Sequence, residues 1–269
     1  MIQLPARHLT PEATAKLTEY QNVIDTEADY SHRVSLAKKH FRLQNRKTNA
    51  TFLEVRATLS QMCAGANRCM YCEDSAADEV EHYFPKDLYP EHVFVWGNYL
   101  YACGPCNGKK RSKFAVFDPH DNPIDVSRKR NAPIAPPTLG HPVLLAPRNE
   151  NALAFMILDI AGDTFLFVPT PTNDARQRRR ARYTINLLGL NSRDYLPKAR
   201  REAYAHYLAI FKEYVTELDN GAPGVTLTRL TNTLQTMHHP TVWQEMQRQR
   251  ASIPDLAELF QRAPEALGW

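Results

Sequence analysis

The sequence has no run of about 18 apolar residues, so no membrane-spanning helix is expected. Its beginning, MIQLPARHLTPEATAK, lacks the apolar segment of a secretory signal peptide, and we therefore expect a cytoplasmic protein with no membrane partner. The sequence also lacks a strong charge imbalance, because 33 basic and 29 acidic residues give a net charge of +4. That charge does not by itself indicate nucleic-acid binding. No internal repeat and no low-complexity tract is present.

Hydrophobic residues make up 43% of the 269 residues, enough for a folded core in one large domain or two small ones. Helical spacing predicts three helices in residues 1–63: the first has Thr10 as its N-cap, the second runs from Asp29 to Gln44, and the third starts near Asn49. A proline-rich connector over 131–151 is followed by two apolar runs that flank Ala161-Gly162-Asp163 and predict a β-hairpin. From residue 174 the pattern is helical to the end of the sequence.

Only five cysteines are present, and four of them form two C-x2-C pairs, Cys69/Cys72 and Cys103/Cys106. In a cytoplasmic protein this pattern favours a metal site over disulfides, and two such pairs supply the four thiolates of a structural zinc site. The alternatives are two unrelated reduced pairs or a redox motif, although neither pair opens a helix within a βαβ pattern. Cys63 is left over, and we interpret it as a small buried residue at the end of a helix.

Between the two cysteine pairs lie Glu81, His82 and Asn98, and Asn107 directly follows the second pair. A histidine can deprotonate water near neutral pH. A carboxylate and an amide oxygen can bind a hard divalent cation, which stabilises negative charge on a phosphate. These side chains suit the hydrolysis of a phosphodiester. The alternative is that His82 is a core histidine whose ring is satisfied by a backbone carbonyl.

The stretch from Arg68 to Phe117 resembles the HNH endonuclease family, of the ββα-metal type with a four-cysteine zinc site. The likeness rests on the order EH, N and CGPCNGKK within Glu81 to Lys110. It implies a β-hairpin followed by a helix that begins near the second cysteine pair. It also implies that His82 is the general base and that Asn98 braces the loop and orients that base. The catalytic Mg²⁺ or Mn²⁺ would be held by Glu81, where many members have aspartate, and by Asn107.

A second resemblance extends beyond this core. The segments PVLLAPRNENALAFMILDIAGDTFLFVP (142–169) and ARYTINLLGLNSRDYLPKAR (181–200) look like those that follow the nuclease core in the retron- and Septu-associated, PtuB-like group. The resemblance implies the nuclease effector of a bacterial anti-phage defence system. It also implies a partner protein, an ATPase of the ABC/SMC-like class (PtuA-like).

Basic side chains after Asn107 would face DNA phosphates. The densest basic run covers 176–182; it could follow a DNA backbone, bind an acidic partner subunit or be solvated. The residues predicted to contact nucleic acid are Lys109, Lys110, Arg111, Lys113, Arg178, Arg179 and Arg182.

We therefore expect an α+β fold: a mostly helical protein around a small zinc-stapled ββα-metal module, with an additional β-hairpin. The expected regions are an N-terminal helical region (1–63), the nuclease module (64–130), and a connector, hairpin and C-terminal helices (131–269). The expected function is metal-dependent hydrolysis of DNA. The alternative is a non-catalytic, zinc-stapled subunit for DNA binding or docking, which would need the cysteines and the basic residues but not His82.

Overall fold

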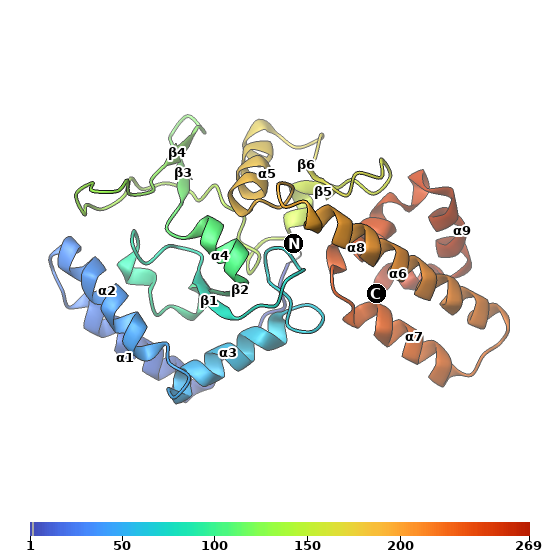
Figure 1. Cartoon of the computed structure of the whole chain (residues 1–269), viewed down its shortest axis with the longest axis horizontal. Helices are drawn as coiled ribbons and strands as arrows, with labels where there is room; N and C mark the ends of the chain where they lie inside the picture. Colours follow the sequence, from blue (N-terminus) through green and yellow to red (C-terminus); the bar gives the residue numbers. More distant parts are fainter. Residues whose placement is uncertain (2) are drawn as a thin grey trace.

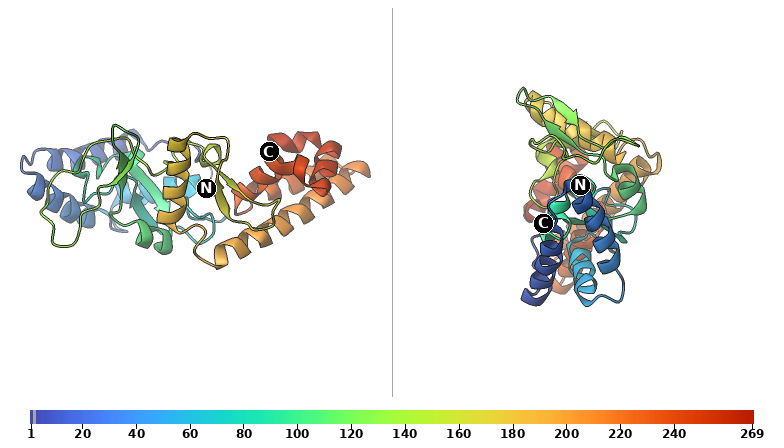
Figure 2. Two further views of the ribbon diagram at one scale, coloured as in Figure 1. Left: turned by 90° about the horizontal axis from the view of Figure 1, so that it is seen from above. Right: turned by 90° about the vertical axis from the view of Figure 1, so that its left-hand side faces the viewer.

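A computed structural model describes residues 1 and 3–269. The molecule is elongated, with α1–α3 at one end, the short strands near the middle and α6–α9 at the other end (Figures 1 and 2). The fold is α+β, and the described residues form three separate two-stranded sheets. Within the described residues, no helix is long and apolar enough to cross a membrane.

The N-terminal end consists of α1 (Pro11–Asp25), α2 (Tyr30–Gln44) and α3 (Ala50–Met62). Each helix begins where a side chain caps its first turn: Thr10, Asp29 and Asn49 accept hydrogen bonds from backbone N–H groups three residues later. These contacts confirm the predicted helix starts. Apolar faces of all three helices bury large side chains against the middle of the molecule.

A hairpin and a helix follow. Strand β1 (Glu79–His82) pairs antiparallel with β2 (Tyr99–Ala102), with His82 opposite Tyr99. The intervening loop contains the short 3-10 turns η1 (Pro90–His92) and η2 (Trp96–Asn98). Helix α4 (Gly104–Lys110) begins directly after Cys103. The order strand, strand, helix agrees with the expectation for this segment.

Two more hairpins extend the middle part of the molecule. Strand β3 (Ala115–Phe117) pairs with β4 (Pro123–Asp125), and β5 (Met156–Leu158) pairs with β6 (Phe167–Pro169). The second of these confirms the hairpin predicted around Ala161-Gly162-Asp163. A 3-10 turn, η3 (Ala152–Ala154), precedes it.

The remaining elements are helical. Helix α5 (Ala175–Leu188) starts with a capping box between Asp174 and Gln177 and ends at Gly189, whose φ of 60° is readily adopted only by glycine. The long α6 (Tyr195–Asp219) packs against the C-terminal helices. These are α7 (Gly224–Thr236), α8 (Pro240–Gln249), η4 (Arg250–Ser252), α9 (Pro254–Arg262) and η5 (Pro264–Gly268). One buried hydrophobic cluster continues from α1 to α9, so the three expected regions share a core.

Arg200 on α6 connects the middle of the molecule to the C-terminal helices α6–α9. Its side chain is only 1% exposed, and its guanidinium donates hydrogen bonds to the carbonyl oxygens of Phe165 (3.0 Å) and Leu190 (2.8 Å). The next residue, Arg201, is exposed and pairs with Asp163 on the surface.

We expect Arg200→Leu to lower the free energy of unfolding by roughly 2–4 kcal/mol, because two buried carbonyl groups lose their donor. The matched variant Arg201→Leu should cost less than about 1 kcal/mol, since surface ion pairs contribute little. Urea denaturation followed by circular dichroism measures both values. Equal effects of the two variants would show that the buried guanidinium does not link the two parts.

Candidate functional site

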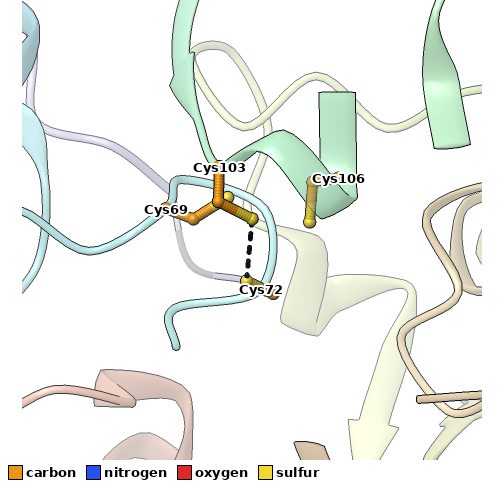
Figure 3. A group of neighbouring side chains, drawn as sticks. All are labelled: Cys69, Cys72, Cys103 and Cys106. Carbon is orange, nitrogen blue, oxygen red and sulfur yellow. Dashed lines mark hydrogen bonds between the residues drawn. The ribbon is translucent and has the colours of Figure 1, made fainter. Parts of the chain in front are cut away.

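The sulfur atoms of Cys69, Cys72, Cys103 and Cys106 lie within 4.8 Å of one another, and all four residues are buried (Figure 3). The Cys72 and Cys103 sulfurs are 3.8 Å apart, far beyond the length of a disulfide. A tetrahedral zinc ion with Zn–S bonds of about 2.3 Å places its sulfurs about 3.8 Å apart. The four thiols therefore fit a structural zinc ion and leave no ligand position for water.

Backbone hydrogen bonds and a nearby cation support this cluster. The N–H of Glu73 donates to Cys69 O (2.8 Å), and the N–H of Cys106 donates to Cys103 O (3.1 Å), which forms the two tight turns. The guanidinium of Arg193 donates to the Cys106 sulfur at 3.2 Å. A zinc ion with four thiolates has a net charge of about −2, so Arg193 offsets part of this charge.

Cys63 stands apart from the cluster at the end of a helix, as expected, but it is half-buried and not buried. It is the C-cap of α3, and its thiol donates to the Leu59 carbonyl (3.4 Å). Burial raises the pKa of this thiol to about 12. It is therefore protonated at neutral pH and a poor metal ligand.

Glu81 forms a buried ion pair with α4. The Lys110 Nζ lies 2.6 Å from Glu81 Oε1 and donates a 2.7 Å hydrogen bond to the backbone carbonyl of His82. The Lys110 side chain is fully buried, and Glu81 is 5% exposed. Lys110 thus joins the helix to the end of β1, and the expectation that it faces phosphate is wrong because it has no solvent-exposed surface.

His82 is also buried, at 3% exposure. Its ring packs edge-on against Phe41 and Tyr99, with ring centroids 4.5 and 5.3 Å away. Its Nε2 lies 3.0 Å from the carbonyl oxygen of Val93. A carbonyl can only accept, so Nε2 carries the proton and Nδ1 is left as the acceptor. Burial lowers the pKa of His82 well below its usual value, which keeps the ring neutral.

Asn98 braces the long loop between β1 and β2. Its side-chain oxygen accepts from the Phe84 N–H (2.7 Å), while its amide nitrogen donates to the carbonyls of Phe84 (3.1 Å) and His92 (2.8 Å). Three bonds from one side chain hold the loop closed just beyond His82. These contacts suit the bracing role expected for Asn98.

Asn107 extends from α4 toward β1 and donates a hydrogen bond to the Glu79 carboxylate. Alternating strand geometry places Glu79 and Glu81 on the same face of β1, where both contact α4. The hydrogen bond directs the Asn107 nitrogen to Glu79, so the amide oxygen is the atom left for another ligand.

A pocket of ≈ 300 Å³ at the end of β1 brings together three of the expected site residues, Glu81, His82 and Asn107. Other side chains that line it include Lys86 and Arg111. Lys86 was not among the expected site residues; its Nζ lies 5.2 Å from the centre of the Phe41 ring. Its position four residues after His82 is a sequence signal that could have identified it.

The other basic candidates divide into two groups. Lys109, Arg111 and Lys113 are exposed on or beside α4. On α5, Arg178 donates to Asn173 O, and Arg179 donates to Asp121 O at 2.6 Å. These two arginines therefore hold neighbouring loops, an intramolecular role that the sequence did not indicate. Arg182 is exposed.

The chain is similar over a short stretch to a Septu protein PtuB of Bacillus thuringiensis, with 45% identity over 62 residues. The match covers 21% of this chain and 24% of that protein's length. No family model matches the chain. The partial similarity supports the resemblance to the Septu-associated group.

The cysteine cluster gives a direct prediction about zinc. Purified protein should contain one zinc per chain by mass spectrometry, and Cys69→Ser or Cys106→Ser should lose it and lower Tm by more than about 5 °C, because a structural metal contributes folding energy. Cys63→Ser is the matched control and should keep both the zinc and the Tm. Full zinc content in Cys106→Ser would contradict the four-thiolate site.

Proposed function

We propose that this chain is a metal-dependent endonuclease of the HNH type that hydrolyses DNA. The observation that supports the proposal most strongly is the single pocket lined by Glu81, His82 and Asn107. It is built on a strand–strand–helix unit whose helix is anchored by the cysteine cluster.

In this proposal His82 accepts a proton from the attacking water through Nδ1. The hydrogen bond from Nε2 to Val93 O fixes the ring orientation, and Asn98 keeps that loop in place. Glu81 and the Asn107 oxygen would hold Mg²⁺ or Mn²⁺, which when bound stabilises charge on the phosphate and the leaving oxygen. Arg111 lines the same pocket and is exposed, so its guanidinium can contact a flanking phosphate.

We further propose that the chain is the nuclease effector of an anti-phage defence system, with an ATPase of the ABC/SMC-like class as its partner. Support comes from the partial similarity to a Septu protein and from the resemblance of 142–169 and 181–200 to that group. A non-catalytic DNA-binding subunit is the second candidate. It is favoured by the full burial of Lys110 against Glu81 and by the carbonyl bond of His82, which a core histidine would also make.

The two candidates differ in their need for His82. With Mg²⁺ or Mn²⁺, and with the proposed ATPase partner present, wild-type protein should nick supercoiled plasmid. His82→Ala should be slower by roughly 10²–10⁴-fold, which is the usual contribution of a general base. His120→Ala, an exposed histidine outside the pocket, should match wild type. Equal rates for wild type and His82→Ala would remove His82 as the base.

A second test concerns Lys110. If its ammonium group orients Glu81 for a cation, Lys110→Met should weaken Mn²⁺ binding by about 10–100-fold, as is typical when a residue that orients a metal ligand is lost. Lys109→Met, at the exposed neighbouring position, should leave Mn²⁺ binding unchanged. Electron paramagnetic resonance titration of free Mn²⁺ measures both. Tighter binding in Lys110→Met would instead mean that Lys110 competes with the cation.

A further inference from the structure

A second hollow lies beside the segment that carries His82. One cavity of ≈ 230 Å³ and another of ≈ 280 Å³ share the lining residues Tyr83, Phe84, Ala146 and Asn149, so they adjoin, and together they are called the groove. Glu81, His82 and Pro85 line the candidate catalytic pocket instead. Five residues of extended chain span at most roughly 18 Å, so residues that line the groove lie within that distance of residues that line the pocket.

The first cavity is lined by apolar and ring side chains. Its lining includes Tyr83, Leu100 and Ala146, which are buried, and the half-buried His92 and Phe84. The His92 ring packs on Phe84 with centroids 4.9 Å apart and planes 32° from parallel. Aromatic and histidine rings of this kind are the surfaces on which proteins stack unpaired bases.

Two polar side chains that line the groove have no hydrogen-bond partner in the described part of the chain. Within residues 1 and 3–269, the ring nitrogens of His92 and the side-chain amide of Asn149 make no hydrogen bond. The groove is lined by three arginines, Arg148, Arg176 and Arg180, against one carboxylate, Glu150. The Arg180 guanidinium pairs with Glu150, and the Arg176 guanidinium pairs with Asp121. Within the described residues Arg148 has no carboxylate partner; it donates to the carbonyls of Trp96 and Tyr99, and its charge is the one that suits a phosphate.

We propose that this groove binds one unpaired nucleotide of the DNA strand to be cut, with its base beside His92 and its phosphate toward Arg148. The inference rests on the proposed DNA substrate. It implies that the protein prefers DNA with a single-stranded or unpaired position next to the scissile bond. Such a pocket can select for an unpaired base because extracting a base from a duplex costs energy.

Gly97 provides a way to fill the cavity. It is exposed, it lines the first cavity, and a Cβ added there meets no atom within 4 Å. Gly97→Leu should therefore fold and occupy the slot. Gly224, on the surface at the start of α7, has the same free space for a Cβ and lies outside the groove, so Gly224→Leu is the matched control.

The probe is a single-stranded DNA oligonucleotide with a central 2-aminopurine, whose fluorescence is quenched by stacking. It is titrated without added Mg²⁺ or Mn²⁺, so no cleavage is needed. Wild type and Gly224→Leu should bind and quench the probe, whereas Gly97→Leu should bind about tenfold more weakly, as expected for one lost stacking contact. Asn149→Ala, at an exposed rim position, should bind a few-fold more weakly.

If Gly97→Leu binds and quenches the probe as wild type does, the proposed nucleotide binding in the groove is overturned, provided that the zinc content and Tm of the variant match those of wild type. If Gly97→Leu is misfolded, wild-type affinity of Asn149→Ala for the probe overturns the proposed nucleotide binding. The plasmid assay separates this inference from the nuclease proposal. Quenching of the probe without plasmid cleavage would refute the nuclease proposal and leave the groove proposal standing. Cleavage without quenching would refute the groove proposal and leave the nuclease proposal standing.

Discussion

The thiol groups of Cys72 and Cys103 lie 3.8 Å apart although they are 31 residues apart in the chain. Without a cation between them, four buried sulfurs offer one another only weak hydrogen bonds. With zinc, the same sulfurs fix the start of α4 relative to the loop before β1. This anchor supports the contacts between α4 and β1, because a seven-residue helix is too short to be stable alone.

The anchored helix places two polar side chains against the two carboxylates of β1. Lys110 holds Glu81 from the buried side, and Asn107 meets Glu79 at the surface. A buried ion pair of this kind is costly unless further hydrogen bonds satisfy the charges, and the bond from Lys110 to the His82 carbonyl provides one of them. The arrangement therefore fixes the end of β1, where three of the candidate site residues meet.

The basic residues show how far a charge pattern can be interpreted. A run of arginines at 176–182 suggested contacts outside the chain, yet Arg178 and Arg179 donate to backbone carbonyls of the chain itself. Arg180 likewise pairs with Glu150. Guanidinium groups have five donors in a planar fork, so a surface helix rich in arginine can fasten neighbouring loops as readily as it can bind a polyanion. Arg176 pairs with Asp121, so among the described residues Arg148 is the groove arginine that has no carboxylate partner.

The sequence by itself determined the local features: the helix starts at Thr10, Asp29 and Asn49, the hairpin around Gly162, and the two cysteine pairs as one metal site. The helix starts and the hairpin depend on residues that are close together in the chain. The metal site depends on the chemistry of four thiol ligands, for which the chain offers one set of two pairs. Only the tertiary structure decided that Lys110 is buried while Lys109 is exposed, since facing directions on a short helix depend on what packs against it. It likewise decided that residues 83–100 and 146–149 enclose a groove, because a cavity exists only between segments that packing brings together from distant parts of the chain.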